Sequence, residues 1–198
     1  MPEKRHLPLA TEWAHHALAE KIRAGAWVLD ATAGNGHDTL FLARQVGSTG
    51  HVFSFDVQEE ALQETRQRLV DAKIQEDRFT LILKSHAHMK EALPMEVLGR
   101  IEAVVFNLGF RPGGDKRMAT ECSSTVAALT SIPTLLAPGG VLTVVAYPGH
   151  ASGKEEAEAV SRWMSALAPE RFEVQNIRAI NRMQPAPELW LALRLGSG

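Results

Sequence analysis

The sequence is short of several features that mark specialised protein classes. Its 198 residues include a single cysteine, Cys122, so no disulfide can form within the chain. We expect this thiol to be a small buried hydrophobe rather than a nucleophile. No apolar run approaches the roughly 20 residues of a membrane span, and the first residues lack the apolar stretch of a signal peptide. These absences predict a cytoplasmic protein without a membrane partner.

An excess of charge of one sign is also lacking. Lys and Arg total 21 against 23 Asp and Glu, which gives a formal net charge of −2. This balance argues against broad binding to nucleic acid through a basic surface, but it allows a local basic patch to hold one RNA loop. The histidines at 15, 16, 86 and 88 lack the spacing that would join them to Cys or carboxylate ligands, so we predict no metal site.

Segments of strand and helix length alternate along the chain. The predicted strands are 27–30, 51–56, 79–83, 101–107, 141–147, 172–180 and 189–195. The predicted helices are 11–24 with Thr11 as its cap, 37–46, 59–72, 119–136, which Pro138-Gly139-Gly140 ends, and 154–167. This alternation predicts an α/β three-layer sandwich around a mostly parallel, seven-stranded sheet.

The last two predicted strands have no helix between them, which indicates an antiparallel hairpin at one edge of the sheet. Class I S-adenosylmethionine-dependent methyltransferases have a Rossmann-like sheet that ends this way, whereas the usual dinucleotide dehydrogenase sheet lacks the hairpin. We therefore predict one methyltransferase domain over residues 1–198, with an N-terminal helix in 1–25 and a Rossmann-like core in 26–198.

The loop after the first strand, Asp30-Ala31-Thr32-Ala33-Gly34-Asn35-Gly36, is the predicted cofactor loop. Its glycines allow a tight turn and the close approach of a ligand. Asp56, at the end of the second strand, is placed as a carboxylate that binds ribose hydroxyls. Thr39 stands where a dehydrogenase fingerprint has its third glycine, and Asp38 adds a carboxylate. That charge is unfavourable beside pyrophosphate and favourable beside a sulfonium, so S-adenosylmethionine is preferred to NAD.

The alternative for the glycine loop is a simple strand-to-helix turn. Further cofactor contacts follow from the ends of the other strands, although solvent-exposed loop residues would also explain these residue types. Val57 and Gln58 could flank the adenine, and Ser85 and His86 could reach its amino edge. The full predicted cofactor set is Asp30, Thr32, Gly34, Asn35, Gly36, Asp38, Thr39, Asp56, Val57, Gln58, Ser85, His86, Asn107, Leu108 and Gly109.

The end of the fourth strand, Phe106-Asn107-Leu108-Gly109-Phe110, predicts the target side of the site. It is similar to the Asn/Asp-Pro-Pro-Tyr/Phe motif of amine-methylating enzymes, with Leu108 and Gly109 in place of both prolines. In such enzymes the side-chain amide and a backbone carbonyl accept hydrogen bonds from the target amine and align it for reaction. The alternative is an asparagine that only caps a strand.

Two loops supply the other predicted catalytic and RNA-binding residues. Asp115 is a candidate general base, and His150 is another because its ordinary pKa lies near neutrality. Tyr147, the only tyrosine, could stack on a flipped base. The predicted RNA-binding residues are Arg111, Lys116, Arg117, Arg178 and Arg182. A solvated loop at 111–117, or a dimer surface around Arg178 and Arg182, would look similar.

Three motifs together resemble the rRNA methylase family typified by YtqB (MnmM). They are Asp-Ala-Thr-Ala-Gly-Asn-Gly-His-Asp-Thr-Leu-Phe-Leu-Ala (30–43), Asn-Leu-Gly-Phe-Arg-Pro-Gly-Gly-Asp (107–115) and Tyr-Pro-Gly-His (147–150). The resemblance covers nearly the whole chain. It implies N-methylation of 5-aminomethyl-(2-thio)uridine at the tRNA wobble position, in the anticodon loop. The family often has Tyr where Phe110 stands, so no role is assigned to a hydroxyl there.

Other functions remain compatible with the residues alone. They are an rRNA methyltransferase, a methyltransferase for small-molecule amines, and a non-catalytic RNA-binding protein of the same fold. The edge hairpin also makes a homodimer a reasonable expectation.

Overall fold

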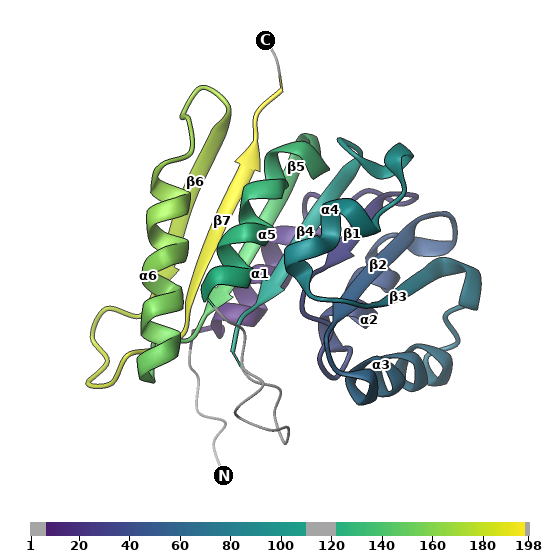
Figure 1. Ribbon diagram of the computed structural model, residues 1–198, viewed down its shortest axis with the longest axis horizontal. Helices are drawn as coiled ribbons and strands as arrows, with labels where there is room; N and C mark the ends of the chain where they lie inside the picture. The colour runs from purple at the N-terminus through teal and green to yellow at the C-terminus, as the bar shows by residue number, and fades with distance from the viewer. Residues whose placement is uncertain (1–6, 110–121, 197–198) are drawn as a thin grey trace.

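A seven-stranded mixed sheet forms the centre of the computed structural model, which describes residues 7–109 and 122–196 (Figure 1). The strand order is β3-β2-β1-β4-β5-β7-β6. The strands are β1 (Trp27–Asp30), β2 (His51–Asp56), β3 (Phe79–Leu83), β4 (Ile101–Asn107), β5 (Leu136–Ala146), β6 (Phe172–Arg178) and β7 (Glu188–Arg194). β1 to β5 pair in parallel, whereas β7 is antiparallel to β5 and β6. The predicted fold, including the closing hairpin, is confirmed.

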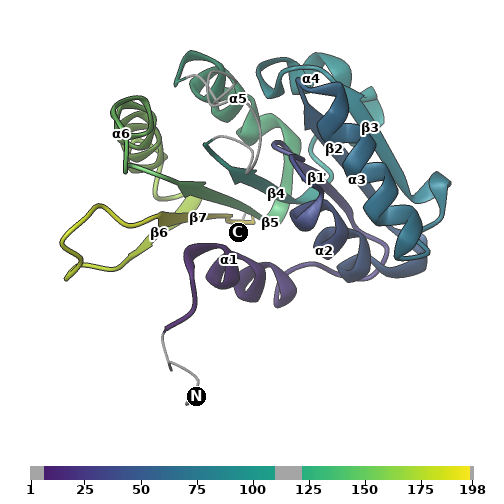
Figure 2. The same ribbon diagram turned by 90° about the horizontal axis from the view of Figure 1, so that it is seen from below.

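Helices cover both faces of this sheet (Figure 2). On one face lie α1 (Ala10–Ala19), α2 (His37–Gln45) and α3 (Glu59–Asp71), and on the other lie α4 (Met89–Ala92), α5 (Cys122–Leu135) and α6 (Ala151–Ser165). Short 3₁₀ turns occupy Gly47–Thr49, Glu76–Arg78, His86–His88 and Met95–Val97. No described helix is both long and apolar enough to cross a membrane.

Separate hydrophobic clusters lie on the two faces of the sheet, because successive side chains of a strand point to opposite faces. Val28 packs in the cluster that contains Leu18 and Leu42 from α1 and α2. Its neighbour Leu29 packs in the other cluster, with Leu129 of α5. The central strands are buried on both sides, which explains why their sequences are almost continuously apolar.

Several predicted boundaries were wrong by a few residues. α1 begins at Ala10 and ends at Ala19 rather than at 24, and its N-cap is Leu9 rather than Thr11. The backbone amide of Leu9 donates to the Glu12 carboxylate at 2.6 Å, so the first turn is closed by a side chain three residues ahead. α3 ends at Asp71 and α2 at Gln45, each one residue early.

The stretch before the fifth strand also differs from the prediction. α5 ends at Leu135, and Pro138-Gly139-Gly140 lies inside β5 rather than between helix and strand. The pairing with β4 jumps from Ile101↔Leu136 to Ala103↔Val141, so the intervening residues bulge out of the ladder.

Further along, α6 begins three residues before the predicted Lys154. The His150 side chain caps it, since Nδ1 of this residue accepts a hydrogen bond from the Gly153 amide at 3.0 Å. β6 ends at Arg178, two residues early, and α4 was not predicted. Cys122 is only partly buried, so the expected core position for this thiol was wrong.

Candidate functional site

The candidate site lies at the carboxyl ends of β1, β2 and β4, along the lower edge in Figure 1. Asp30, Asp56 and Asn107 are the last residues of these three strands. The chain order of the parallel strands reverses between β1 and β4, and ligands of open α/β sheets bind at such a switch point.

Asp30 is a fully buried carboxyl at the base of the predicted cofactor loop. It accepts hydrogen bonds from the Thr39 hydroxyl at 2.6 Å and the Thr32 amide at 3.0 Å. Burial, reinforced by the nearby charge of Asp38, raises the pKa of Asp30 to about 7. A cationic ligand near this carboxyl would favour its charged form, which suits a sulfonium or ammonium group.

The loop itself is held by α3. Gly36 has φ +75°, and a Cβ on it would lie 2.8 Å from the Cα of Thr65. The Thr65 hydroxyl donates to the carbonyl of Gly34 at 3.2 Å, and Nε of Arg68 donates to the carbonyl of Asn35 at 2.6 Å. Only glycine allows the left-handed turn and the close helix packing together at position 36.

Asp56 ties the loop to the end of the second strand. Its carboxylate accepts from the Gly34 amide at 2.8 Å and from the Gln58 amide at 2.9 Å. Each carboxylate oxygen has a second lone pair, so ribose hydroxyls could still bind there. Val57 is 53% exposed beside it, which leaves an apolar surface for a base.

Ser85 and His86 have contacts within the fold. The Ser85 hydroxyl accepts from the Ala87 amide at 3.2 Å and so caps a 3₁₀ turn. His86 is buried, lies edge-on to Phe106, and is within 3.2 Å of the Ser124 hydroxyl. Burial lowers the pKa of His86, so its ring is neutral at pH 7. Their contact with adenine stays a prediction.

Asn107 joins the two sides of the site. Its backbone amide donates to the Thr32 hydroxyl at 2.8 Å, which connects β4 to the cofactor loop. Its side chain lies between Asp38 and Tyr147: Nδ2 donates to the Asp38 carboxylate at 3.1 Å, and Oδ1 accepts from the Tyr147 hydroxyl at 2.8 Å. Asp38 thus contacts the target-side asparagine, a role that the sequence did not suggest.

The residues on either side of Asn107 complete this part of the site. Leu108 is buried, and its amide donates to the carbonyl of Val145 at 2.8 Å. A Cβ on Gly109 would lie 3.5 Å from the Tyr147 ring, so the backbone passes close to that ring. Burial and the charge of Asp38 raise the pKa of Tyr147, and its hydroxyl therefore remains a donor at neutral pH.

His15, on α1, is a member of this cluster that sequence reasoning missed. Its Nε2 lies 2.6 Å from the Asp38 carboxylate, and its ring stacks on Phe41 with centroids 3.9 Å apart. The available signal was its spacing: in a helix, His15 follows Ala14 and lies three residues before Leu18, which puts it beside the buried face.

Three other predicted residues that the structure describes, His150, Arg178 and Arg182, have no contact with this cluster that the structure records. His150 is exposed, and its Nδ1 is engaged in capping α6. Arg178 and Arg182 are exposed at the end of β6 and in the loop that follows, together with Ile180 and Met183. Four predicted residues lie outside the described part of the chain: Arg111, Asp115, Lys116 and Arg117.

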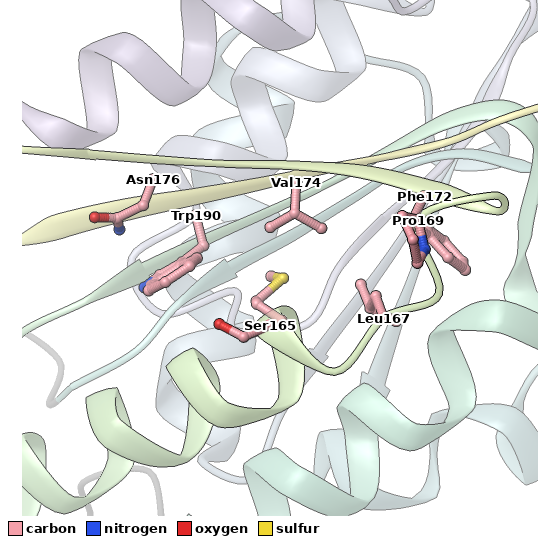
Figure 3. A pocket seen from close by; sticks show the side chains of 8 residues that line it. Ser165, Leu167, Pro169, Phe172, Val174, Asn176 and Trp190 are labelled. Atoms are coloured by element: carbon pink, nitrogen blue, oxygen red, sulfur yellow. The ribbon is translucent and has the colours of Figure 1, made fainter.

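A separate cavity of about 440 Å³ lies between the end of α6 and the hairpin (Figure 3). It is lined by Met164, Ser165, Leu167, Pro169, Phe172, Val174, Asn176 and Trp190. None of the predicted site residues lines it. Within the two described segments, no group of three or more His, Cys, Asp or Glu side chains is arranged to hold a metal ion.

Comparison with known sequences assigns the chain to a protein family. The model of the family described as "Putative rRNA methylase" matches residues 52–193. The chain is 34% identical over 178 residues to the Arabidopsis thaliana "tRNA (mnm(5)s(2)U34)-methyltransferase, chloroplastic". That match covers 87% of this chain and 65% of the Arabidopsis protein, so the chain spans less than two thirds of that relative's length.

Solved structures agree with the sequence comparison. A "putative rRNA-methylase" from Clostridium thermocellum superposes with a TM-score of 0.90 at 35% identity, covering 96% of this chain and all of that one. A "putative methyltransferase" from Streptococcus mutans, solved in complex with SAH, superposes with a TM-score of 0.84 at 29% identity, with 96% of this chain and all of that chain covered. The family resemblance inferred from the three motifs is confirmed: the chain belongs to the rRNA methylase family, and its fold is that of the class I methyltransferases.

Proposed function

We propose that this protein is an S-adenosylmethionine-dependent RNA methyltransferase that N-methylates the 5-aminomethyl group of wobble (2-thio)uridine in tRNA. The observation that carries the proposal is the Asn107 side chain, which stands at the tip of β4 beside an acidic, glycine-containing loop. The name of the Arabidopsis relative, which specifies mnm(5)s(2)U34, supports the choice of tRNA and of position.

The residues present fit this cofactor. Two carboxylates, Asp30 and Asp56, contact the loop, and the open side of Gly34 leaves room for a ligand near the backbone. When bound, S-adenosylmethionine supplies a methyl group on a positively charged sulfur. Asp56 would hold the ribose, and the loop backbone together with Asp30 would hold the amino acid end.

On the target side, the chain's own residues act by orientation. The Oδ1 atom of Asn107 has a lone pair left after its bond to Tyr147, and that lone pair can accept from the target amine. Fixing one N–H fixes the direction of the nitrogen lone pair, and alignment of this kind lowers the barrier chiefly through proximity. A role for Asp115 or His150 as the proton acceptor remains part of the proposal.

RNA would lie across the exposed loop after β6. Arg178 and Arg182 supply positive charge there, while Asn181 and Gln184 supply polar groups, and all four are exposed. This loop joins β6 to β7, and it lies at the same edge of the sheet as the carboxyl end of β4 (Figure 1). A cytoplasmic location and a homodimer are further parts of the proposal.

The test is mass spectrometry of tRNA. Purified protein, S-adenosylmethionine and tRNA carrying 5-aminomethyl-2-thiouridine should yield the methylaminomethyl nucleoside. A deletion strain without a second enzyme for this step should lack that nucleoside. Unchanged methylaminomethyluridine in such a strain would refute the proposed substrate.

Two other functions give different results in the same experiments. A methyltransferase for small amines, which the net charge of −2 favours over RNA, would methylate free amines or nucleosides without tRNA. A non-catalytic RNA-binding protein would fail to bind S-adenosylmethionine in calorimetry.

A further inference from the structure

Four side chains from four elements form one continuous hydrogen-bonded chain at the target side of the site. His15 of α1 contacts Asp38 of α2 at 2.6 Å, and Asp38 contacts Asn107 of β4 at 3.1 Å. Asn107 in turn accepts from Tyr147, which follows β5, at 2.8 Å. Two of these residues, Asp38 and Tyr147, therefore hold the amide that is proposed to bind the target, and His15 holds Asp38.

The Asp38 carboxylate, which lies between His15 and Asn107, sets the direction of each hydrogen bond in this series. An ionised carboxylate can only accept, so both His15 Nε2 and the Asn107 amide nitrogen must donate to Asp38. The Asn107 oxygen is consequently on the opposite side, where the Tyr147 hydroxyl donates to it. The carboxylate therefore fixes the orientation of the nearly symmetric Asn107 amide, with Nδ2 toward Asp38 and Oδ1 toward Tyr147.

This orientation matters for the chemistry. An amide turned by 180° would present its NH₂ group, a donor, toward the place where a target amine must itself donate. Two donors cannot hydrogen-bond to each other, and the amine would lose its alignment. With Asp38 in place, the second lone pair on the Asn107 oxygen is available to accept a hydrogen bond from the N–H of the target amine.

Asp38 is itself held firmly. Its side chain is 12% exposed, and that of His15 is 32% exposed. The His15 ring lies parallel to Phe41, with an angle of 1° between the ring planes. Helix α1 packs against β5 and β7, so the position of His15 is fixed relative to the strand that leads to Tyr147. Partial burial strengthens a charge-assisted hydrogen bond of this kind.

We propose that His15 and Asp38 are positioning residues that hold the Asn107 amide with its oxygen toward the target. This orientation selects a substrate that can donate an N–H hydrogen bond. The proposal rests on the proposed function for its substrate, a primary amine, and extends it to two residues. Asp38 then acts on the target side rather than as a cofactor contact.

The kinetic test uses Asp38→Ala, with Asp71→Ala as a matched control on the solvent side of α3. Loss of the orienting carboxylate should lower kcat for tRNA methylation about 10-fold, because the amide is free to turn. The KM for tRNA and the Kd for SAH should stay within about twofold, as expected when only alignment is lost. If SAH binding weakens as much as kcat falls, Asp38 is a cofactor contact and the proposal is wrong.

His15 provides a second test that leaves the carboxylate in place. His15→Phe keeps an aromatic ring to stack on Phe41 but cannot donate, and kcat should fall about threefold. His15→Gln, which retains a side-chain N–H donor, should restore most of the activity. The control is His16→Phe, since His16 is the exposed neighbour on the same helix. Equal loss in the Phe and Gln variants would overturn the role of the hydrogen bond.

A measurement without substrate separates this proposal from the proposed function. The side-chain NH₂ signals of Asn107, identified by their loss in Asn107→Ala, should exchange slowly with water in the wild type. They should exchange faster in Asp38→Ala and His15→Phe. Unchanged exchange overturns the positioning role even if tRNA is methylated. Faster exchange together with an enzyme inactive on amines would instead refute the proposed substrate alone.

Discussion

The two sides of the candidate site are built over different distances along the chain. On the cofactor side, Gly34 and Asp56 are 22 residues apart, and the loop is held by Thr65 and Arg68 of the helix that follows. On the target side, Asp38 and Asn107 are 69 residues apart, and Asn107 and Tyr147 a further 40. The first side is one βαβ unit and the helix after it, whereas the second joins α1, α2, β4 and the residue after β5.

This difference explains which side could be read from the sequence. A βαβ unit imposes its own spacing, so a glycine loop and a carboxylate one strand later form a recognisable pattern. No spacing rule links α1 to α2 and β4, and the partners of Asn107 were therefore not predictable as a set. Substitutions on the cofactor side should therefore change SAH affinity, whereas substitutions on the target side should change kcat.

The largest effect is expected from Gly36→Ala on the cofactor side. The new Cβ would lie 2.8 Å from the Cα of Thr65 in a left-handed backbone, so the loop or α3 must move. We expect SAH binding to fall more than 10-fold and thermal stability to drop, at a cost of about 1–3 kcal/mol. The control is Gly139→Ala, where φ is +78° and nothing lies within 4 Å of the added Cβ. Similar SAH affinities in the two variants would contradict the role of helix contact.

On the target side, Asn107→Ala should lower kcat by at least about 10-fold through lost orientation. The affinity for SAH, measured by calorimetry, should change little, because the side chain contacts Asp38 and Tyr147 rather than the loop. Near-normal turnover would show that Asn107 only ends a strand.

The proposed RNA-binding arginines should respond separately from both sides. Replacing Arg178 and Arg182 by Ala should weaken tRNA binding several-fold and reduce the salt dependence of log K by about 2, one for each lost phosphate contact. SAH binding should be unchanged. Arg171→Ala, an exposed arginine at the opposite end of β6, is the control. An unchanged salt dependence in the double variant would remove this loop from the RNA interface.

A smaller effect is expected from Tyr147→Phe. It removes one of the two hydrogen bonds that hold the Asn107 amide and leaves the Asp38 bond, so kcat should fall about threefold. Because the raised pKa of Tyr147 keeps the hydroxyl protonated, the pH–rate profiles of the wild type and the variant should have the same shape below pH 9. A changed profile would mean that Tyr147 transfers a proton.

The smallest effect concerns stability and pH. The pKa of Asp30 is about 7 in the folded protein and 3.8 ordinarily, so the folded state binds the proton more tightly. Stability contributed by this group therefore falls as pH rises from about 4 to about 7. Asp30→Asn should raise the melting temperature of the ligand-free protein by a few degrees at pH 8 and by less at pH 5. An equal change at both pH values would contradict the raised pKa.

Most of the fold was predictable because each element has a local cause. The apolar runs gave all seven strands, and the missing helix before Leu189 indicated the antiparallel hairpin. Ends of elements were less predictable. The Leu9–Glu12 contact and the His150 cap are side-chain hydrogen bonds that set where α1 and α6 begin, and the spacing of apolar residues does not reveal them. The bulge at 137–140 arises from pairing with β4, which has no signature in its own residues.

By itself, the sequence determined the sheet, the glycine loop, the acidic character of the cofactor side and the family, because strand period, turn chemistry and charge are properties of neighbouring residues. Only the tertiary structure decided what Asp38 contacts. As the first-turn acid of α2 it could have faced a ligand or the helix N-terminus alone. Packing of α1 against β5 and β7 brings His15 to it, and β4 brings Asn107. The carboxylate contacts these partners because α1, α2 and β4, which are far apart in the sequence, meet at the same end of the sheet.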